Sequence, residues 1–540
     1  MDVARFLTGK ASLGTFLFLG LVASPDIFAA NTWIIRLKKE SAASDNFAAQ
    51  AVSLDHKRTR LKKFKDSRLA RKKGLVLPRT ELVIAEDLSA GEVADLRNNP
   101  EVAYVEENID WKPQGDLGDS SSWPSSFEQA PWLRDLMGFE SDTPDPEIPL
   151  SLSSSRSIVA VIDTGTKSEH PFLSSALEPN LAELDGTTGV DDDRNGFVDD
   201  VYGANAISRS GNGTEDYSSH GTHVAGIVKT IRDHAIAEFP AAQNVSILPV
   251  RFIGDDGSGS TASAIVALEY ALARGASVVN ASWGAKGNNS YSQALYDTFA
   301  KLYENDVVLA IAAGNADSQG ANNNDVVPYF PANYNIPSLL SVASATPSYN
   351  SVTDTLVSLS LSGFSNYGRT TVQIAAPGDY ADGRGGTSGI LSAYSGYGPW
   401  GNLYIKKQGT SMAAPVIAGI AGVMRAVNTS LTAFEIKELL IETSKKYSSL
   451  KKIQSASLVQ ARDAILLAQE TTTRGTHPRL PAIPVRQNAG ESKPPEHGGG
   501  CASLAPVKPQ GPFGGNSLGL LTAVYAAWAL LRSRRKKRQV

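Results

Sequence analysis

Between residues 157 and 345, short apolar runs recur in the chain and are separated by longer stretches with helical periodicity. The runs are SIVAVID, VSILPVRFI, ASVVNAS, VVLAIAAGN and LLSVASA, and the stretches between them include STASAIVALEYALARG and QALYDTFAKLYEN. Continuous apolar runs are typical of strands buried on both faces, and the intervening helices return the chain to the same end of the sheet. The pattern therefore predicts an α/β fold in which a central, mostly parallel sheet lies between two layers of helices.

Polar residues stand at the ends of these runs. Asp163 ends the first run, Asn315 closes AIAAGN, His220 begins HGTHVAGIV after a polar loop, and Ser411 lies at the start of the small-residue stretch TSMAAPVIAGIAG. Binding sites of open α/β sheets lie at the carboxyl ends of the strands. A serine hydroxyl becomes a nucleophile when a base takes its proton, and an imidazole base needs a carboxylate to fix its tautomer. These residue types together indicate acyl transfer through an activated serine.

Other chemistries fit single residues. Asp163, Thr164 and Gly165 form the tripeptide of aspartic peptidases, but those enzymes need a second carboxylate, and no second Asp-Thr-Gly or Asp-Ser-Gly occurs. His220 and His223 have the spacing of a zinc pair, but no motif supplies a matching third ligand. Taken alone, Thr410 or Ser411 would be explained as a helix N-cap. The serine mechanism accounts for all four residues at once.

Five segments, VAVIDTG, HGTHVAGI, VVNASWG, AAGN and GTSMAAP, resemble the signature segments of subtilisin-like serine peptidases. They stand in the usual order of that family, which places the aspartate, the histidine and the serine in that sequence. The resemblance implies a subtilisin-like three-layer fold. It implies that Ser411 is the nucleophile, His220 the general base and then acid, Asp163 the group that orients His220, and Asn315 a side-chain donor to the oxyanion.

The resemblance also implies which residues bind the substrate. It implies that Ser282, Trp283 and Gly284 pair with an extended substrate and that Gly314 lines the primary specificity pocket, with a cis proline in the YFP segment at 329–331. Tyr329 stands where the family often has a smaller residue, which argues against a deep pocket for aromatic side chains.

Six segments are expected along the 540 residues. Residues 1–30 have the basic start, the apolar run LGTFLFLGLVA and the small residues of a signal peptide. Residues 31–110 form a small α/β module that resembles the subtilisin propeptide, which acts as chaperone and inhibitor. Residues 111–155 are a linker and the start of the mature chain, 156–468 the peptidase domain, 469–516 a Pro/Gly-rich linker, and 517–540 a hydrophobic segment with a basic tail.

The two ends of the chain predict an extracytoplasmic location. The order of the Gly-rich stretch, the apolar SLGLLTAVYAAWALL and the basic RSRRKKR resembles C-terminal sorting signals of Gram-negative surface proteins, which a membrane protease removes. A plain stop-transfer anchor is the alternative. With Cys501 as its single cysteine, the chain forms no intramolecular disulfide.

Charge is concentrated in two places. Residues 57–73 contain ten Lys or Arg against one acid, which indicates a solvated helix, a linker or a secondary processing site; no interleaved aromatic motif points to nucleic acid. The acidic stretch DDDRNGFVDDVYG offers Asp191, Asp193, Asn195 and Asp199 as calcium ligands. It lacks the bidentate glutamate of an EF-hand at position 12, where Tyr202 stands, so a solvated acidic turn is the alternative.

The expected function is that of a secreted or envelope-anchored serine endopeptidase made as an autoprocessed zymogen. It would hydrolyse protein or peptide substrates without a cofactor for the chemistry, with structural calcium as an addition. Its partners would be its own propeptide as inhibitor and a sorting protease acting on the tail. A catalytically silent binding scaffold with the same fold is the alternative, and the intact Asp163, His220, Ser411 and Asn315 argue against it.

Overall fold

The computed structural model describes residues 32–38, 47–69, 72–113, 131–139, 150 and 156–481, with gaps at 212, 351, 354, 382–388, 397–402 and 474. The predicted signal peptide, most of the 111–155 segment, Cys501 and the C-terminal hydrophobic segment lie outside the described residues.

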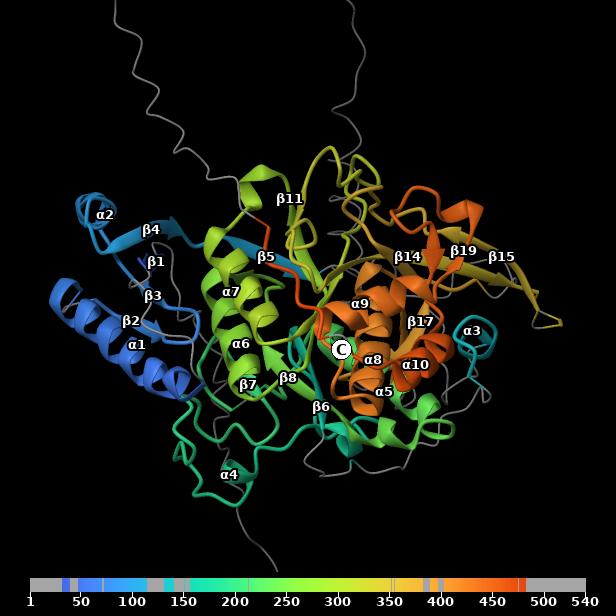
Figure 1. Cartoon of the computed structure of the whole chain (residues 1–540), viewed down its shortest axis with the longest axis horizontal. Coiled ribbons are helices and arrows are strands. Elements are labelled where there is room, and N and C mark those ends of the chain that lie inside the picture. Colours follow the sequence, from blue (N-terminus) through green and yellow to red (C-terminus); the bar gives the residue numbers. More distant parts are fainter. Residues whose placement is uncertain are drawn as a thin grey trace, which may run out of the picture. The chain divides into compact units, whose positions relative to one another are not determined.

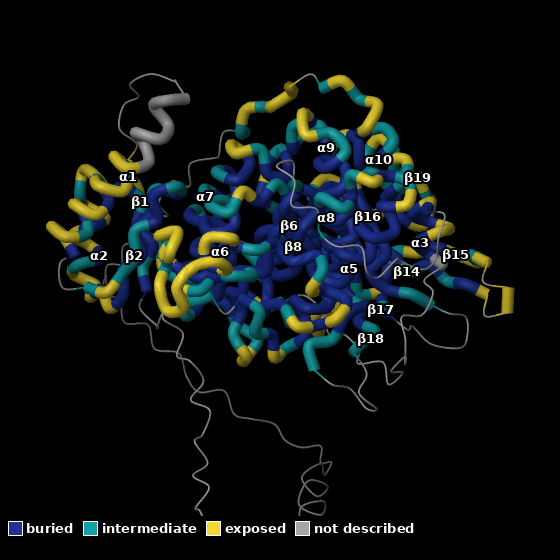
Figure 2. The backbone as a smooth tube through the Cα atoms, turned by 90° about the horizontal axis from the view of Figure 1, so that it is seen from below, coloured by how far each residue is buried: buried dark blue, intermediate teal, exposed yellow. Residues whose placement is uncertain are grey.

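An antiparallel sheet of the order β2-β3-β1-β4 forms the N-terminal module. Its strands are β1 (Trp33–Leu37), β2 (Gly74–Leu77), β3 (Leu82–Ala85) and β4 (Val102–Glu107), and its helices are α1 (Phe47–Arg68) and α2 (Ala90–Arg97). A capping box formed by Ser89 and Glu92 starts α2. Most of the basic run lies on α1, which buries Leu61 and Phe64 against the module, and most other side chains of residues 55–68 are exposed (Figure 2).

The central sheet has the order β19-β20-β16-β14-β12-β10-β6-β8-β7. Its strands are β6 (Ser157–Asp163), β7 (Ala204–Asn205), β8 (Val245–Arg251), β10 (Val278–Ala281), β12 (Val308–Ala312), β14 (Leu339–Tyr349), β16 (Ile374–Pro377), β19 (Lys445–Lys446) and β20 (Ser457–Leu458). The pairs from β7 to β20 are parallel, whereas β19 pairs antiparallel with β20 and β15 (Leu356–Leu361) pairs antiparallel with β14. All five predicted apolar runs are strands of this sheet, which confirms the α/β prediction.

Helices cover both faces of the central sheet (Figure 1). One layer contains α5 (His220–Ile236), α8 (Thr410–Val427), α9 (Ala433–Glu442) and α10 (Ala461–Glu470), and the other contains α6 (Thr261–Ala273) and α7 (Gln293–Glu304). Alternate residues of β6 belong to the two cores: Val159 and Val161 face the first layer, and Ala160 and Ile162 the second.

Helix α8 is long and apolar enough to cross a membrane, the one such helix among the described residues. However, 94% of it is buried inside the protein, as expected of a core helix. Its small residues permit this burial, since a Cβ atom on Gly419 would lie 2.9 Å from the Cβ of Ile231 in α5. Helix α8 is therefore a core helix of the protein.

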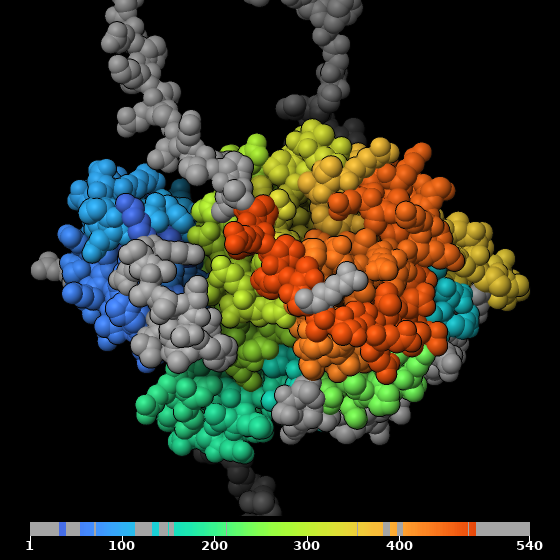
Figure 3. Space-filling view, viewed as in Figure 1, coloured from blue at the N-terminus to red at the C-terminus, as the bar shows by residue number. Residues whose placement is uncertain are grey.

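A second sheet joins the N-terminal module to the rest of the fold, in the order β13-β11-β5-β9. It consists of β5 (Asp110–Pro113), β9 (Gly259–Ser260), β11 (Trp283–Lys286) and β13 (Tyr329–Phe330). The remaining elements are α3 (Pro131–Asp135), α4 (Leu181–Leu184), the hairpin β17 (Ile390–Ala393) and β18 (Tyr404–Lys407), and the 3₁₀ turns η1 (Ser174–Ala176), η2 (Pro240–Asn244), η3 (Asn288–Ser290) and η5 (Ser448–Leu450). In Figure 3 the module, in blue, lies against the green surface near α6 and α7.

Candidate active site

Asp163 and His220 form a buried pair at the carboxyl end of β6. Asp163 Oδ1 lies 2.7 Å from His220 Nδ1 and also accepts the backbone N–H of Thr164 at 2.8 Å. Both side chains are at most 1% exposed. Because a carboxylate bound to Nδ1 holds a proton on that nitrogen, Nε2 is the basic nitrogen of the ring.

Ser411 lies at the start of α8, next to the helix that begins with His220. Val228 lies eight residues beyond His220, and Gly419 lies eight residues beyond Ser411. A Cβ atom on Gly419 would lie 3.3 Å from the carbonyl oxygen of Val228. Both helices also pack against η2, the turn that leads into β8. The two helices therefore run side by side in the same direction, and both begin at the carboxyl edge of the sheet.

The hydroxyl of Ser411 is held by main chain. Ser411 Oγ donates to the carbonyl of Ser282 at 3.0 Å, and Ser282 Oγ donates to the carbonyl of Ser411 at 3.0 Å. This reciprocal pair places the N-terminus of α8 beside the start of β11.

Asn315 is oriented by the residue that precedes Ser411. Its Oδ1 accepts the backbone N–H of Thr410 at 2.9 Å and the Thr410 hydroxyl at 3.0 Å. Thr410 Oγ1 also accepts the N–H of Gly314 at 3.2 Å. With its oxygen engaged in this way, Asn315 turns its NH₂ group away from Thr410, the orientation that a donor to an oxyanion requires. Sequence reasoning considered Thr410 only as a cap and missed this role.

Asp216 is a further residue that sequence reasoning missed. It is 6% exposed, and burial raises its pKa. Its carboxylate accepts hydrogen bonds from the hydroxyls of Thr164 and Thr222 and from the backbone N–H groups of Ser218, Ser219 and Thr222, at 2.6–3.1 Å. Ser219, which precedes His220, has a left-handed φ of 65°. Asp216 thus connects the turn before His220 to the end of β6. In the sequence, the only indication of this role was the position of Asp216 in the polar loop before His220.

The predicted substrate-binding strand is paired with the chain's own β5. Trp283 lies opposite Pro113, and Gly284 opposite Lys112, in an antiparallel register. On its other edge β5 pairs with β9, where Gly259 lies opposite Trp111. The end of the N-terminal module therefore lies as an extended strand between two strands of the peptidase domain.

Tyr329 fills the space between the two predicted substrate-binding glycines. A Cβ atom on Gly284 would lie 2.5 Å from its ring, and one on Gly314 would lie 2.9 Å from it. The Phe330–Pro331 bond is cis, as the YFP segment predicted. Burial raises the pKa of Tyr329. The ring leaves little depth for a substrate side chain between these glycines.

His223 does not form a metal pair with His220. Its Nε2 lies 3.0 Å from the carbonyl of Ile390 and 3.1 Å from that of Ile405. These carbonyls belong to β17 and β18, so the ring of His223 connects the hairpin to α5. His220 is hydrogen-bonded to Asp163 instead.

The acidic loop contains a group of three carboxylates. Oxygen atoms of Glu183, Asp193 and Asp200 all lie within 4.8 Å of one another, and burial raises the pKa of Asp200. Asp193 was a predicted ligand. Glu183 was missed because it precedes the predicted stretch, and Asp200 was missed although it lies inside the stretch, beside the predicted Asp199.

The other predicted ligands make contacts within the loop. Asp199 accepts the N–H of Gly189 at 2.9 Å, and Asp191 accepts those of Asn195 and Gly196 at 3.0 and 2.9 Å. The Asn195 amide nitrogen, not its oxygen, points to Asp193 and Asp200. The donor atoms of the carboxylate group are hard oxygens of the kind calcium prefers.

A buried carboxylate–imidazole pair beside a serine at a helix N-terminus, at the carboxyl edge of a parallel sheet, belongs to the class of serine hydrolases. The model of the subtilase family, Peptidase_S8, matches residues 154–463, more than half of the chain. The chain belongs to the subtilase family, which confirms the resemblance drawn from the five motifs.

Relatives of known name agree with this membership. The chain is 30% identical over 297 residues to subtilisin-like protease 1 of Plasmodium vivax, covering 54% of this chain and 44% of that protein. It is 30% identical over 308 residues to thermitase of Thermoactinomyces vulgaris, covering 57% and 88%. The chain thus spans less than half the length of the Plasmodium relative.

Among solved structures, the fold is similar to that of fervidolysin from Fervidobacterium pennivorans, a keratinolytic enzyme related to subtilisin. The TM-score is 0.53 at 21% identity, with 81% of this chain and 61% of that chain covered. This likeness supports the subtilisin-like fold.

Proposed function

We propose that this chain is a serine endopeptidase that hydrolyses peptide bonds of protein substrates through an acyl-enzyme. The observation that carries the proposal is the 2.7 Å contact between Asp163 Oδ1 and His220 Nδ1, both buried, beside helix α8, whose second residue is Ser411. An imidazole held in this way has the tautomer that a general base for serine needs.

In the proposed mechanism, Ser411 Oγ attacks the substrate carbonyl carbon while His220 Nε2 takes the hydroxyl proton. Asp163 stays ionised and stabilises the imidazolium. The oxyanion accepts hydrogen bonds from the Asn315 amide and from the backbone N–H of Ser411. His220 then gives its proton to the leaving amine, and a water molecule repeats the steps on the ester, releasing the acid and restoring Ser411.

The N-terminal module is proposed to act as an inhibitory propeptide that the enzyme cleaves from itself. The support is the pairing of β5 with β11: Pro113 lies opposite Trp283, and the residue before Trp283 is Ser282, which is hydrogen-bonded to Ser411. In this antiparallel register β5 runs towards Ser282 and therefore towards Ser411. Self-cleavage is therefore expected near residue 115.

Mass spectrometry of the purified protein tests both proposals when wild type is compared with Ser411→Ala. Wild type should begin near residue 115 and its serine should react with a fluorophosphonate; the alanine variant should stay uncleaved and unlabelled. A folded wild-type protein that neither cleaves itself nor reacts with the probe would support the binding scaffold. The same new N-terminus in both proteins would show that another protease acts.

Calcium is proposed to bind at the carboxylates of Glu183, Asp193 and Asp200, where it would offset the repulsion between negative charges held within 4.8 Å. If so, added calcium should raise the Tm of wild type and change that of Asp193→Asn much less. An equal shift in both proteins would place the ion elsewhere.

Export and attachment to the envelope are proposed from the sequence of the two ends alone. Mass spectrometry of the cell-associated protein would distinguish the fates of the tail. Loss of residues 517–540 would support a sorting protease, and their retention a permanent anchor.

A further inference from the structure

Asp216 is a buried carboxylate four residues before His220, and the proposed mechanism does not use it. Within the described part of the chain it accepts five hydrogen bonds, from the hydroxyls of Thr164 and Thr222 and from the backbone N–H groups of Ser218, Ser219 and Thr222. Five donors around one buried side chain raise the question of what its negative charge does.

The two hydroxyls show that Asp216 acts as an acceptor. Thr164 Oγ1 accepts the N–H of Gly221 at 2.9 Å, and Thr222 Oγ1 accepts the N–H of Lys167 at 3.0 Å. Each hydroxyl therefore turns its own proton towards Asp216. Burial raises the pKa of Asp216, whereas hydrogen bonds from donors stabilise its charged form. The geometry is that of an ionised carboxylate.

His220 is the first residue of α5, where the helix itself disfavours a positive charge. The N–H groups of the first turn have no partner within the helix and give this end a partial positive charge. Ser219 precedes the helix with a left-handed φ of 65°, and its side chain turns to the Ser395 hydroxyl at 2.6 Å instead of capping the helix. Asp216 supplies the acceptor from outside the helix, at the N–H of Thr222.

The proposed mechanism places a positive charge on His220 when its imidazole takes the proton of Ser411. Asp163 offsets this charge through its contact with Nδ1. The N-terminus of α5 opposes it, and a negative charge bonded to that N-terminus reduces the opposition. Thr164 fixes the two carboxylates relative to each other, since its N–H donates to Asp163 at 2.8 Å and its hydroxyl donates to Asp216 at 2.9 Å.

The cations nearest to this turn have carboxylate partners of their own. Arg251, at the end of β8, lies 2.5 Å from Asp255 and 3.7 Å from Glu215. Lys167 pairs with Glu169 at 2.9 Å. The hydrogen bonds of Asp216, in contrast, come from the turn, from the end of β6 and from α5. Removing its charge therefore changes the field at the start of α5.

We propose that Asp216 is a positioning residue for His220 in the peptidase reaction. It fixes the turn that presents the imidazole, and its negative charge offsets the positive end of α5, so that His220 accepts the proton of Ser411 more readily. The proposal rests on the proposed peptidase function. A purely structural role would need the acceptor oxygens of Asp216 but not its charge, so the charge distinguishes the two roles.

The rate at which a fluorophosphonate labels Ser411, measured on the autoprocessed protein as a function of pH, tests the charge, because labelling needs His220 as a neutral base. Asp216→Asn keeps one acceptor oxygen and removes the charge. The midpoint of the acidic limb should move to lower pH by about 0.5–1 unit, less than the roughly 1–3 units of a charge in direct contact. Well below the midpoint, the variant should retain about a 3- to 10-fold larger fraction of its plateau rate.

Two further variants separate charge from geometry. Asp216→Glu keeps the charge but displaces the oxygen atoms, and Thr222→Val removes one donor without changing any charge; both should lower the plateau rate and leave the midpoint in place. The matched control is Asp306→Asn. It removes a carboxylate that also caps a helix from outside, at the N–H of Ala433 in α9, but at the opposite edge of the central sheet, and it should change neither rate nor midpoint.

The outcomes separate this proposal from the peptidase function itself. If Asp216→Asn has the midpoint of wild type, the charge plays no part and the proposal is wrong, while the peptidase stands. If Thr222→Val shifts the midpoint as far as Asp216→Asn does, geometry alone accounts for the shift and the proposal is also wrong. If Asp216→Asn yields no labelled protein, Asp216→Glu decides: an unchanged midpoint at a reduced rate supports the proposal, and a shifted midpoint contradicts it. If wild type itself is not labelled, the proposed function fails first.

Discussion

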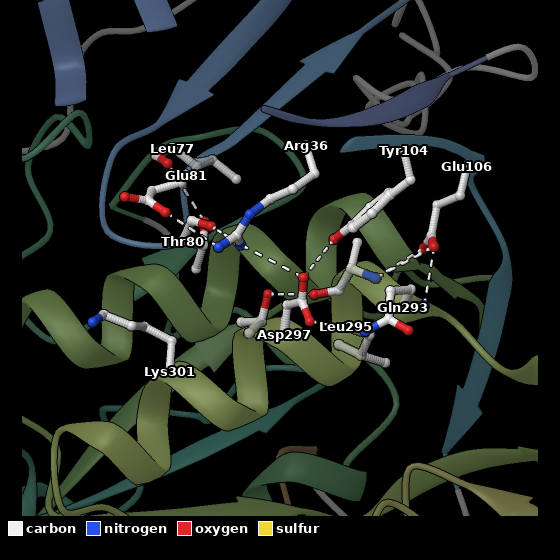
Figure 4. A network of polar contacts seen from close by, with 12 residues as sticks. Arg36, Leu77, Thr80, Glu81, Tyr104, Glu106, Gln293, Leu295, Asp297 and Lys301 are labelled. Atoms are coloured by element: carbon white, nitrogen blue, oxygen red, sulfur yellow. Dashed lines mark hydrogen bonds and ion pairs between the residues drawn. The ribbon is translucent and has the colours of Figure 1, made fainter. Parts of the chain in front are cut away.

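Glu106 of the N-terminal module completes the start of helix α7 in the peptidase domain, and its removal should loosen the module. Its carboxylate accepts the N–H of Gln293 at 3.0 Å, that of Ala294 at 3.3 Å and the hydroxyl of Ser292 (Figure 4). The first N–H groups of a helix have no partner within the helix, so this side chain supplies one. Glu106→Ala removes the acceptor for three donors at once.

The expected cost follows from these contacts. Three donors at about 0.5–1.5 kcal/mol each, partly offset by water that reaches them when the module opens, give about 2–3 kcal/mol. That is an increase of about 30- to 150-fold in the opening equilibrium of the module. Burial raises the pKa of Glu106, which means that the negative charge itself contributes little. Glu106→Gln keeps an acceptor oxygen and should therefore cost no more than about 1 kcal/mol.

Hydrogen exchange on full-length Ser411→Ala protein measures this opening, because the chain then stays intact. The amides of Gln293, Ala294 and strand β4 should exchange faster in Glu106→Ala by the factor given above. Glu107→Ala, at an exposed neighbouring position of β4, is the matched control and should change little. If Glu106→Gln proves as damaging as Glu106→Ala, charge rather than acceptor geometry holds the module, and the reasoning fails.

Three further predictions concern the peptidase domain. Asn315→Ala should lower kcat by about 10²–10³ with little change in KM, the cost known for the corresponding donor in subtilisin itself; steady-state kinetics with titrated enzyme that show an unchanged kcat would remove Asn315 from the oxyanion site. Tyr329→Gly should open the space beside Gly314, so that peptides with phenylalanine before the scissile bond gain about 10-fold over alanine peptides; equal gains would mean that the ring does not limit the pocket. Burial lowers the pKa of Lys437 to about 8, so the folded protein binds this proton more weakly than the unfolded chain and gains stability as pH rises from about 8 to 10.5. Lys437→Met should therefore raise the free energy of unfolding at pH 7 by about 1–2 kcal/mol, a gain that shrinks towards pH 10.5, and denaturant titrations at both pH values that show a constant gain would contradict it.

The local sequence pattern was sufficient to predict the central sheet and the kind of chemistry at the site. The strands β6 and β12 are buried at every position, and β12 and the middle of β6, Ile158 to Ile162, are apolar throughout, because helices cover both faces of these strands. Asp163 ends β6 and Asn315 follows β12, and their residue types with those of His220 and Ser411 indicate one kind of catalysis. Subtilase membership was predicted from the resemblance of five sequence segments to the signature segments of that family, and the family model confirms it.

Contacts between segments that lie far apart in the chain could not be predicted from the sequence in the same way. Asp216 lies 53 residues beyond Asp163 in an unremarkable polar loop, and only the folded turn shows that its carboxylate gathers the donors before His220. Glu183 and Asp193 likewise meet through the loop between them. A side chain's type states what it can bind, but its partners depend on chain closure over many residues.

Trp111 shows most clearly the difference between what the sequence predicts and what the tertiary structure decides. Its sequence neighbourhood, DWKP, predicts neither a buried tryptophan nor a partner strand, since short polar segments carry no periodic signal. The sequence alone predicted a parallel sheet with Ser411, the proposed nucleophile, at its edge, because burial of strands and spacing of motifs are local properties. The tertiary structure decided that β5 lies between β9 and β11, that Thr261 meets the indole of Trp111 there and that Tyr329 fills the space between two glycines, because these depend on which surfaces meet.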